Sequence, residues 1–215
     1  MKSGGSVRSH SSREVFMRTY TERIVIVDEE DNCIGEEDKE KCHDGEGILH
    51  RAFLAMVFNK KGELVLARRS GKKRLWPGFW DGTVASHLFM GEDYEQASRR
   101  RLAEEIGLAA GRIQYLFKFH YKVGYEDKGT ENEICAVMMV GGIDEKDLVP
   151  AHSEISEIRT QRLDDLAREI AESRDKSGYV PWLILAVERM SKHCPAEAAA
   201  VADASYFSDM RDFRC

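Results

Sequence analysis

The hydrophobic and polar positions of this chain alternate in short blocks that are typical of buried strands. The run at residues 52–58 ends at Asn59-Lys60-Lys61-Gly62, which predicts a hairpin turn into a returning strand. Residues 134–140 are nearly all apolar, so we expect this strand near the centre of a sheet. The predicted strands span residues 24–27, 52–58, 63–68, 113–123 and 134–140.

Other segments have the composition and spacing of helices. Helix-forming residues fill positions 92–106, and Gly107 supplies a stop signal. Further helices are predicted at residues 163–172 and 182–190, the last preceded by Pro181, a residue that helices tolerate at their start. Because strands and helices interleave without a repeat period, the fold class is α/β or α+β.

The domain organisation is simple. We expect one domain over residues 21–192, preceded by a disordered leader at residues 1–20 and followed by a C-terminal extension at residues 193–215. The leader is assigned because its first residues are mostly Ser, Gly, Arg and His.

Charge and cysteine usage exclude several functions. The formal net charge of −6 lacks the basic excess of nucleic-acid-binding proteins, and no apolar stretch approaches the roughly 20 residues of a membrane helix. The 5 cysteines contain no CxxC pair, which favours a cytoplasmic location. We therefore expect a small-molecule substrate, no nucleic-acid or membrane partner, and an oligomeric state that the sequence leaves open.

A basic stretch stands out in this acidic chain. Five cations fall between residues 68 and 74, just before the glycine turn Trp76-Pro77-Gly78: Arg68, Arg69, Lys72, Lys73 and Arg74. Such a cluster is suited to binding a diphosphate through charge-assisted hydrogen bonds. The alternative is a solvated loop.

Two groups of carboxylates are placed to work together. On a helix, Arg101, Glu104 and Glu105 share one face, where they can hold Mg²⁺ beside a phosphate; the alternative is a solvated face with an ordinary Arg100–Glu104 pair. On a strand, Glu131 and Glu133 point to the same side because they are two residues apart.

The segment from Ser86 to Leu108 resembles the Nudix box, G-x5-E-x7-R-E-U-x-E-E-x-G-U, where U is a bulky aliphatic residue. The positions on pattern are Glu92, Arg100, Leu102, Glu104, Glu105, Gly107 and Leu108. Ser86 replaces the opening glycine, and Arg101 replaces a glutamate that supplies metal oxygens in Nudix hydrolases. The resulting Arg-Arg pair is similar to that of type I isopentenyl-diphosphate isomerases, which share the Nudix fold.

The likeness to these isomerases extends over separated motifs from His43 to Trp182. It implies an α/β/α sandwich with a central mixed sheet, the box helix on one face and the C-terminal helices on the other. It also implies a metal site built from His43, His50, His87, Glu131 and Glu133, an active-site tyrosine at Tyr121, and a tryptophan at Trp182 that borders the organic group. Three imidazoles and two carboxylates suit Zn²⁺, Mn²⁺ or iron better than Mg²⁺.

The resemblance implies roles for the remaining polar residues. Glu105, with substrate phosphates, is expected to hold a second ion, Mg²⁺, and Glu104 to assist with that ion and a water. The expected diphosphate ligands are Arg69, Lys73 and Arg101. Glu133, Glu105, Glu104 and Tyr121 are the expected catalytic residues.

The isomerase pattern is broken at its catalytic position and at Glu104, where these isomerases usually have no acid. The family has a catalytic cysteine two residues before the third histidine, and this chain has Ala85 there. Isomerisation needs two proton carriers, and a methyl group is not one. We rank metal-dependent hydrolysis of a prenyl or nucleoside diphosphate first, because Glu104 matches the hydrolase pattern. An isomerase with a substituted or engineered acid position ranks second, and a non-catalytic diphosphate binder third.

Overall fold

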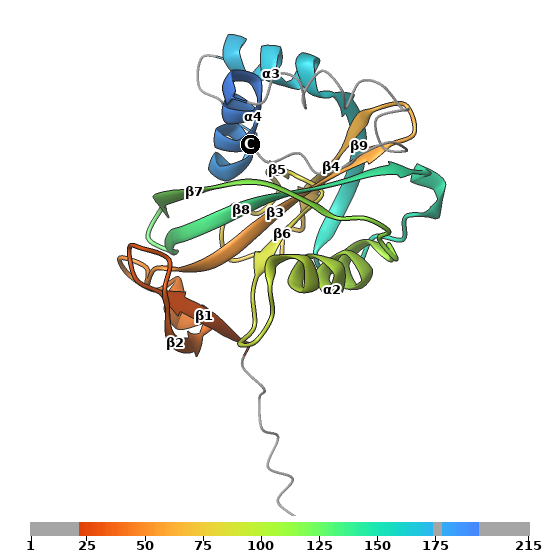
Figure 1. Ribbon diagram of the computed structural model, residues 1–215. Helices are drawn as coiled ribbons and strands as arrows, with labels where there is room; N and C mark the ends of the chain where they lie inside the picture. Colours follow the sequence, from red (N-terminus) through yellow and green to blue (C-terminus); the bar gives the residue numbers. More distant parts are fainter. Residues whose placement is uncertain (1–21, 174–177, 194–215) are drawn as a thin grey trace, which may run out of the picture.

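Figure 1 shows the computed structural model, which describes residues 22–173 and 178–193. The strands of the described residues are β1 (Arg23–Val27), β2 (Cys33–Asp38), β3 (His50–Asn59), β4 (Glu63–Arg69), β5 (Trp80–Asp81), β6 (Val84–His87), β7 (Gln114–Tyr125), β8 (Gly129–Ile143) and β9 (Ile155–Arg162). The helices are α1 (Lys39–Cys42), α2 (Tyr94–Ile106), α3 (Leu163–Glu172) and α4 (Pro181–His193), with a 3-10 turn at Glu145–Asp147. The predicted leader and residues 194–215 of the predicted extension lie outside the described residues.

Strand β3 organises the sheet. It pairs in parallel with β8 and antiparallel with β1 and β6, and β8 pairs on its other edge with β7. A single register pair, Phe58 with Leu64, joins β3 to β4, which carries β5 and β9. Because β8 has a neighbour on each edge, the prediction that residues 134–140 form a central strand is confirmed.

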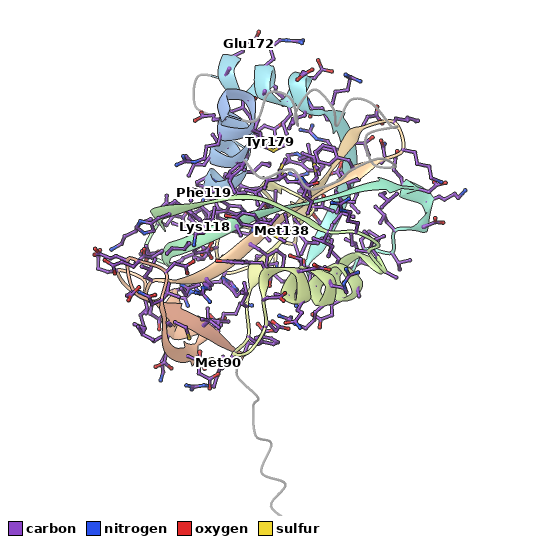
Figure 2. All side chains as sticks on the ribbon, in the orientation of Figure 1. Met90, Lys118, Phe119, Met138, Glu172 and Tyr179 are labelled. Carbon is purple, nitrogen blue, oxygen red and sulfur yellow. The ribbon has the colours of Figure 1, made fainter. Side chains whose placement is uncertain are left out.

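The sheet is covered on both faces, so the predicted α/β/α sandwich is confirmed. Phe53 and Val57 of β3 belong to the core beneath α2, whereas Leu54 and Phe58 belong to the core beneath α3 and α4. In Figure 1, α2 lies on one side of the sheet and α3 and α4 on the other. Figure 2 shows that side chains fill both layers.

The box helix α2 begins at a capping box. The Asp93 side chain accepts a hydrogen bond from the Gln96 backbone N–H at 2.7 Å, and the Gln96 side chain accepts one from the Asp93 N–H at 3.0 Å. The helix ends at Gly107 with a φ of 67°, a left-handed conformation that favours glycine. Glu92 therefore lies before the helix and forms an ion pair with Arg100 at 2.6 Å.

Some short or polar elements were not predicted. β5 has two residues, and β9 carries mostly polar side chains at partly exposed positions. Neither has the continuous apolar run that identifies a buried strand. No helix among the described residues has the length and apolar composition needed to cross a membrane.

Candidate metal centre and active-site cavity

Five potential metal ligands converge from four parts of the chain. His43 follows α1, His50 opens β3, His87 ends β6, and Glu131 and Glu133 lie on β8. The parallel register places His50 opposite Glu133. The candidate ligand atoms of all five side chains lie within 4.8 Å of one another, so the structure brings together the whole set that the sequence suggested.

Each histidine presents Nε2 to a carboxylate. His43 Nε2 lies 3.0 Å from Glu131 Oε2, while His50 and His87 Nε2 lie 3.2 and 3.0 Å from Glu133 Oε1. The Nδ1 atoms of His43 and His50 lie 2.6 and 2.7 Å from the backbone carbonyls of Lys39 and Ile48. A carbonyl only accepts, so these Nδ1 atoms donate the proton to it, and the Nε2 atoms face the centre.

The buried oxygen of Glu131 tests whether a cation fits. Glu131 Oε2 is inaccessible to solvent and has no hydrogen-bond partner among the described residues; its approach to His43 Nε2 is close but not in hydrogen-bond geometry. A buried carboxylate oxygen that makes no well-formed hydrogen bond is costly, and a divalent cation among three nitrogens and two carboxylates would satisfy it. The residues present therefore fit a divalent metal ion.

The electrostatics of the centre are uneven. Burial, with His50 and His43 nearby, holds the pKa of His87 well below its usual value. Burial also acts to lower the pKa of His43, but its contact with Glu131 outweighs this and raises that pKa to about 9. For Glu133, burial acts to raise the pKa, and the contacts with His50, Glu131 and Tyr121 together more than offset it, so the carboxyl pKa is lowered.

Tyr121 completes the surroundings of Glu133. Its hydroxyl donates a hydrogen bond to Glu133 Oε2 at 2.5 Å, and both side chains are buried. Burial and the Glu133 charge raise the tyrosine pKa well above its usual value. Tyr121 is therefore a neutral donor that fixes the free oxygen of this carboxylate.

The loop between His43 and His50 is held against the start of β8. Thr130 N–H and Oγ1–H donate to the carbonyls of His43 and Gly45 at 2.9 and 2.6 Å, and Asn132 Nδ2 donates to the carbonyl of Gly47 at 3.1 Å. Thus the middle residue of the Glu131-Asn132-Glu133 motif positions the loop from the opposite side of the strand.

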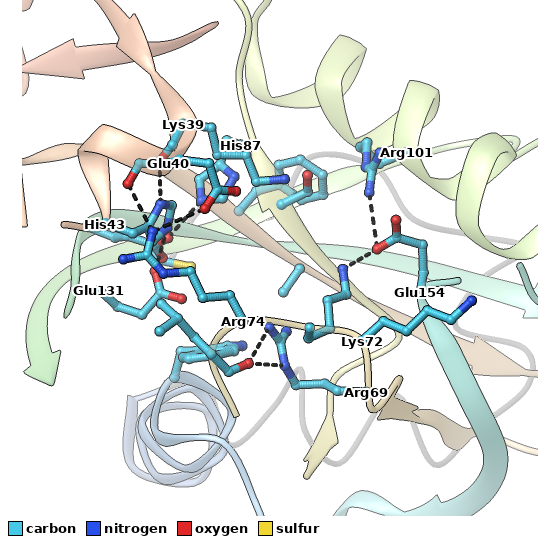
Figure 3. Close-up of a pocket in the computed structure, with 18 of the residues that line it drawn as sticks. Lys39, Glu40, His43, Arg69, Lys72, Arg74, His87, Arg101, Glu131 and Glu154 are labelled. Carbon is cyan, nitrogen blue, oxygen red and sulfur yellow. Dashed lines mark hydrogen bonds and ion pairs between the residues drawn. The ribbon is translucent and has the colours of Figure 1, made fainter. Parts of the chain in front are cut away.

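The metal centre opens into a cavity of about 280 Å³. Figure 3 shows His43 and Glu131 at one side of it, Arg101 and Glu154 at the other, and Arg69 between them. Besides the centre, the lining includes six cations, an apolar group and a thiol: Lys39, Arg69, Lys72, Lys73, Arg74, Arg101, Trp182, Ala85 and Cys135. The combination of a metal site, clustered cations and an apolar wall suits a small organic anion.

Most of these cations already have acidic partners. Lys73 forms a close ion pair with Glu154, and Arg101 Nη2 lies 3.8 Å from the same carboxylate. Arg101 also contacts Glu105 at 2.6 Å and Glu104 at 2.9 Å. Sequence reasoning missed Glu154, because it lies in a polar loop with no motif to distinguish it.

The two box carboxylates have different surroundings. Glu105 is buried next to Arg101 and lines a small cavity beside the main one, outside the His/Glu cluster. Burial raises its pKa, and Arg101 only partly offsets this. Glu104 is exposed and does not line either cavity. The roles expected for both stay predictions.

Comparison with known proteins establishes the family. The NUDIX domain family matches residues 48–183, so the chain belongs to this family. Within it, the chain belongs to the branch of isopentenyl-diphosphate isomerase-like proteins. It is 35% identical over 171 residues to the isopentenyl-diphosphate Delta-isomerase of Haloarcula marismortui, covering 78% of this chain and 90% of that protein. A protein of the same name from Paenarthrobacter aurescens is 32% identical, covering 85% and 98%.

Solved structures support the fold. The crystal structure of DR0079 from Deinococcus radiodurans matches with a TM-score of 0.62 at 24% identity, covering 78% of this chain and 98% of that one. The MutT protein of Methanosarcina mazei matches with a TM-score of 0.51 at 19% identity, covering 67% and 96%. At these identities the likeness shows the Nudix fold alone.

The preference for diphosphate hydrolysis is wrong. The curated relatives are named as isomerases, which agrees better with our second-ranked alternative. The structure supplies a physical reason: Glu104, the residue on which the hydrolase preference rested, is exposed and paired with Arg101 rather than directed into the cavity.

Proposed function

We propose that this protein interconverts isopentenyl diphosphate and dimethylallyl diphosphate. The observation that most supports the proposal is the setting of Glu133, a buried carboxylate between two imidazoles and a tyrosine hydroxyl at the wall of a cationic cavity. The names of the relatives support the same reaction.

The reaction moves protons without net gain or loss. One proton is added to the terminal carbon of the double bond, and one is removed from the carbon next to the former double bond on the diphosphate side. Proton carriers must lie within hydrogen-bond reach of these carbons. Glu133 takes up the proton that is removed, and the Tyr121 hydroxyl donates the proton that is added. The hydrogen bond between the two groups returns the proton from the Glu133 carboxyl to the tyrosine oxygen, so both carriers are restored.

The acid position requires a substitute for the missing cysteine. Ala85 lines the cavity but carries no exchangeable proton. Cys135 also lines the cavity, on the same face of β8 as Glu133, and burial raises its thiol pKa well above the usual value. We assign the second proton carrier to Tyr121 and use Cys135→Ser to test the alternative, since only a thiol role predicts a loss of rate in that variant.

The opposite end of the cavity is assigned to the diphosphate. Arg101 and Lys73 line this end, Arg69 lies between it and the metal centre, and the three side chains offer several N–H donors to phosphate oxygens. Glu105 lies next to Arg101 and, with phosphate oxygens, is suited to a second ion. Trp182 borders the organic group.

The ions are proposed from ligand chemistry. The nitrogen-rich set of His43, His50 and His87 with two carboxylates favours Mn²⁺ or Zn²⁺, while the carboxylate and phosphate oxygens near Glu105 favour Mg²⁺. A bound divalent ion at the His/Glu centre supplies positive charge that stabilises the ionised carboxylates.

We also propose a cytoplasmic location and a small diphosphate as the physiological partner. Cys42 and Cys135 are buried free thiols, which is typical of a reducing environment. The net charge of −6 disfavours binding to nucleic acid, which is itself negatively charged.

Deuterium exchange tests the proposed reaction. Purified protein with MnCl₂ and MgCl₂ in D₂O should incorporate deuterium into isopentenyl diphosphate and produce dimethylallyl diphosphate, both followed by NMR. Glu133→Gln should lower the rate by more than about 100-fold, in the range expected for a general acid-base group. Glu157→Gln, an exposed carboxylate on β9, is the matched control and should retain the rate. Absence of exchange in the unmodified protein would contradict the proposal.

Ala85 favours one second candidate, a diphosphate-binding protein without turnover. This alternative predicts saturable binding of dimethylallyl diphosphate, no deuterium exchange in the unmodified protein, and exchange in Ala85→Cys. Because the substitution adds only a thiol at the cavity wall, a gain of exchange would identify the acid position as the defect.

A further inference from the structure

Asp81 lies at a junction between the two halves of the cavity wall. It is 4% exposed and belongs to the two-residue strand β5. Its Oδ1 accepts hydrogen bonds from Trp182 Nε1 at 2.8 Å and from the Gly82 N–H at 2.7 Å. Its Oδ2 accepts one from Arg69 Nη1 at 3.0 Å. One carboxylate thus holds a residue of the cationic wall and a residue of the apolar wall.

Arg69 is held in one orientation by these contacts. Its Nε and Nη2 donate to the carbonyl of Leu75 at 3.2 and 3.0 Å, and its guanidinium lies 5.2 Å from the centre of the Trp182 ring. The hydrogen bond to Asp81 fixes Nη1, the third nitrogen of the Arg69 guanidinium. The orientation of Arg69 toward the cavity therefore depends on both Asp81 and Trp182.

Trp182 connects Asp81 and Arg69, through Tyr121, with the Glu133 carboxylate. Its ring packs edge-on against Trp76 at 5.3 Å between centroids and lies 6.0 Å from the Tyr121 ring. Tyr121 in turn donates to Glu133. A continuous set of packed and hydrogen-bonded side chains thus runs from the diphosphate end to the metal centre.

We propose that Asp81 is a positioning residue that couples the diphosphate-binding side chain Arg69 to the aromatic wall residue Trp182. Asp81 does not itself line the main cavity, whereas both of its side-chain partners do. It holds Arg69 and Trp182 in fixed positions relative to each other. The choice of ligand class rests on the proposed function; the coupling rests on the contacts of Asp81.

Asparagine cannot replace this carboxylate. An amide has one acceptor oxygen and one NH₂ group, so it can accept from Trp182 and Gly82 or from Arg69, but not from both sides. The NH₂ group of the asparagine would then face N–H donors, either that of Arg69 or those of Trp182 and Gly82. Asp81→Asn therefore breaks the link between Arg69 and Trp182 while almost preserving the volume of the side chain.

Calorimetric binding of inorganic pyrophosphate provides the test, because it needs no turnover. The measurements use four proteins: unmodified, Asp81→Asn, Trp182→Phe and the double variant. Asp81→Asn should weaken pyrophosphate binding by about tenfold, the size typical of one charge-assisted hydrogen bond. Trp182→Phe keeps an aromatic ring but removes the N–H donor. It should weaken pyrophosphate binding by about threefold, because Asp81 loses a donor that fixes its orientation while Arg69 still has an aromatic ring beside it.

The double variant decides between coupling and independent effects. If Asp81 transmits the effect, Trp182→Phe should cause no further loss in the Asp81→Asn background. Mn²⁺ affinity should be unchanged in all four proteins, and Asp165→Asn, an exposed carboxylate on α3, should bind pyrophosphate as the unmodified protein does.

Three results would overturn the inference: additive losses in the double variant, unchanged pyrophosphate affinity in Asp81→Asn, or no pyrophosphate binding by the unmodified protein. If Asp81→Asn does not fold, Trp182→Phe alone still tests the coupling, because wild-type pyrophosphate affinity in that variant contradicts it. The deuterium-exchange experiment tests the proposed reaction separately. If the variants show the coupling but the unmodified protein shows no deuterium exchange, the isomerase function is rejected and the role of Asp81 is retained.

Discussion

The two ends of the cavity are built on opposite electrostatic principles. At the His/Glu end, the Nε2 atoms of three histidines and the carboxylates of Glu131 and Glu133 converge on one point, and Glu131 Oε2 is buried without a well-formed hydrogen bond. At the basic end, Lys73 and Arg101 are already paired with Glu154. The ligands of the first end already lie together, and a cation displaces only the His43 proton. At the second end, phosphate oxygens must replace carboxylates when a ligand binds.

The largest effect is expected at the preorganised end. His50→Asn removes a nitrogen that lies 3.2 Å from Glu133 and is completely buried. We expect Mn²⁺ affinity to fall by at least about 100-fold, since the loss of an inner ligand exceeds the 10–100-fold typical of outer-shell partners. Calorimetry measures the affinity. His152→Asn, an exposed histidine before β9, serves as the control, and an equal loss in both variants would contradict a specific role for His50.

A smaller effect is expected from the loop that holds the histidines. Gly47 has a φ of 72°, and a Cβ there would lie 3.0 Å from the Thr130 carbonyl oxygen and 3.1 Å from Asn132 Cβ. Gly47→Ala should displace the loop and lower Mn²⁺ affinity by about tenfold. Gly45 also has a positive φ, 55°, but has open space around its Cβ position, so Gly45→Ala is a matched control. Similar losses in both would show that only backbone strain matters.

At the basic end, removing an acid should improve binding. Glu154→Gln releases Lys73 and lowers the negative charge near Arg101. We expect pyrophosphate affinity to rise by about fivefold at low salt, with a smaller rise at high salt because screening weakens the charge interactions. Glu157→Gln is the control from the same strand region. A weaker affinity in Glu154→Gln would mean that this carboxylate assists the ligand.

The smallest expected effect is a proton released when the metal binds. The pKa of His43 is raised to about 9, so its ring is charged at pH 7 when no cation is bound. A metal ion needs the neutral ring, and its binding should release about one proton at pH 7. Affinity should therefore rise as pH increases toward 9 and fall as pH decreases. Calorimetry in buffers with different ionisation enthalpies measures the proton; no buffer dependence would contradict the charged state of His43.

Much of the fold was predictable from the sequence, because many elements have a clear pattern of apolar and polar residues. The apolar run at residues 134–140 predicted a central strand, and residues 163–172 predicted α3 with its observed bounds. Strands β5 and β9 were missed, because an edge strand or a two-residue strand is defined by its partner and not by its own hydrophobicity.

The candidate site shows the same division. The spacing of Glu131 and Glu133 alone placed both carboxylates on one side of a strand, because side chains alternate along an extended backbone. The acidic partners of the cations could not be predicted in this way. Asp81 meets Trp182 across 101 positions and Lys73 meets Glu154 across 81, distances over which local pattern carries no information.

The sequence by itself determined the residue types, the alternation of faces and the positions of most elements. Only the tertiary structure decided which charges neutralise one another and which are left facing the cavity. The physical reason is that a charged side chain acquires its properties from the groups within a few ångströms, and sheet pairing brings those groups together from distant parts of the chain.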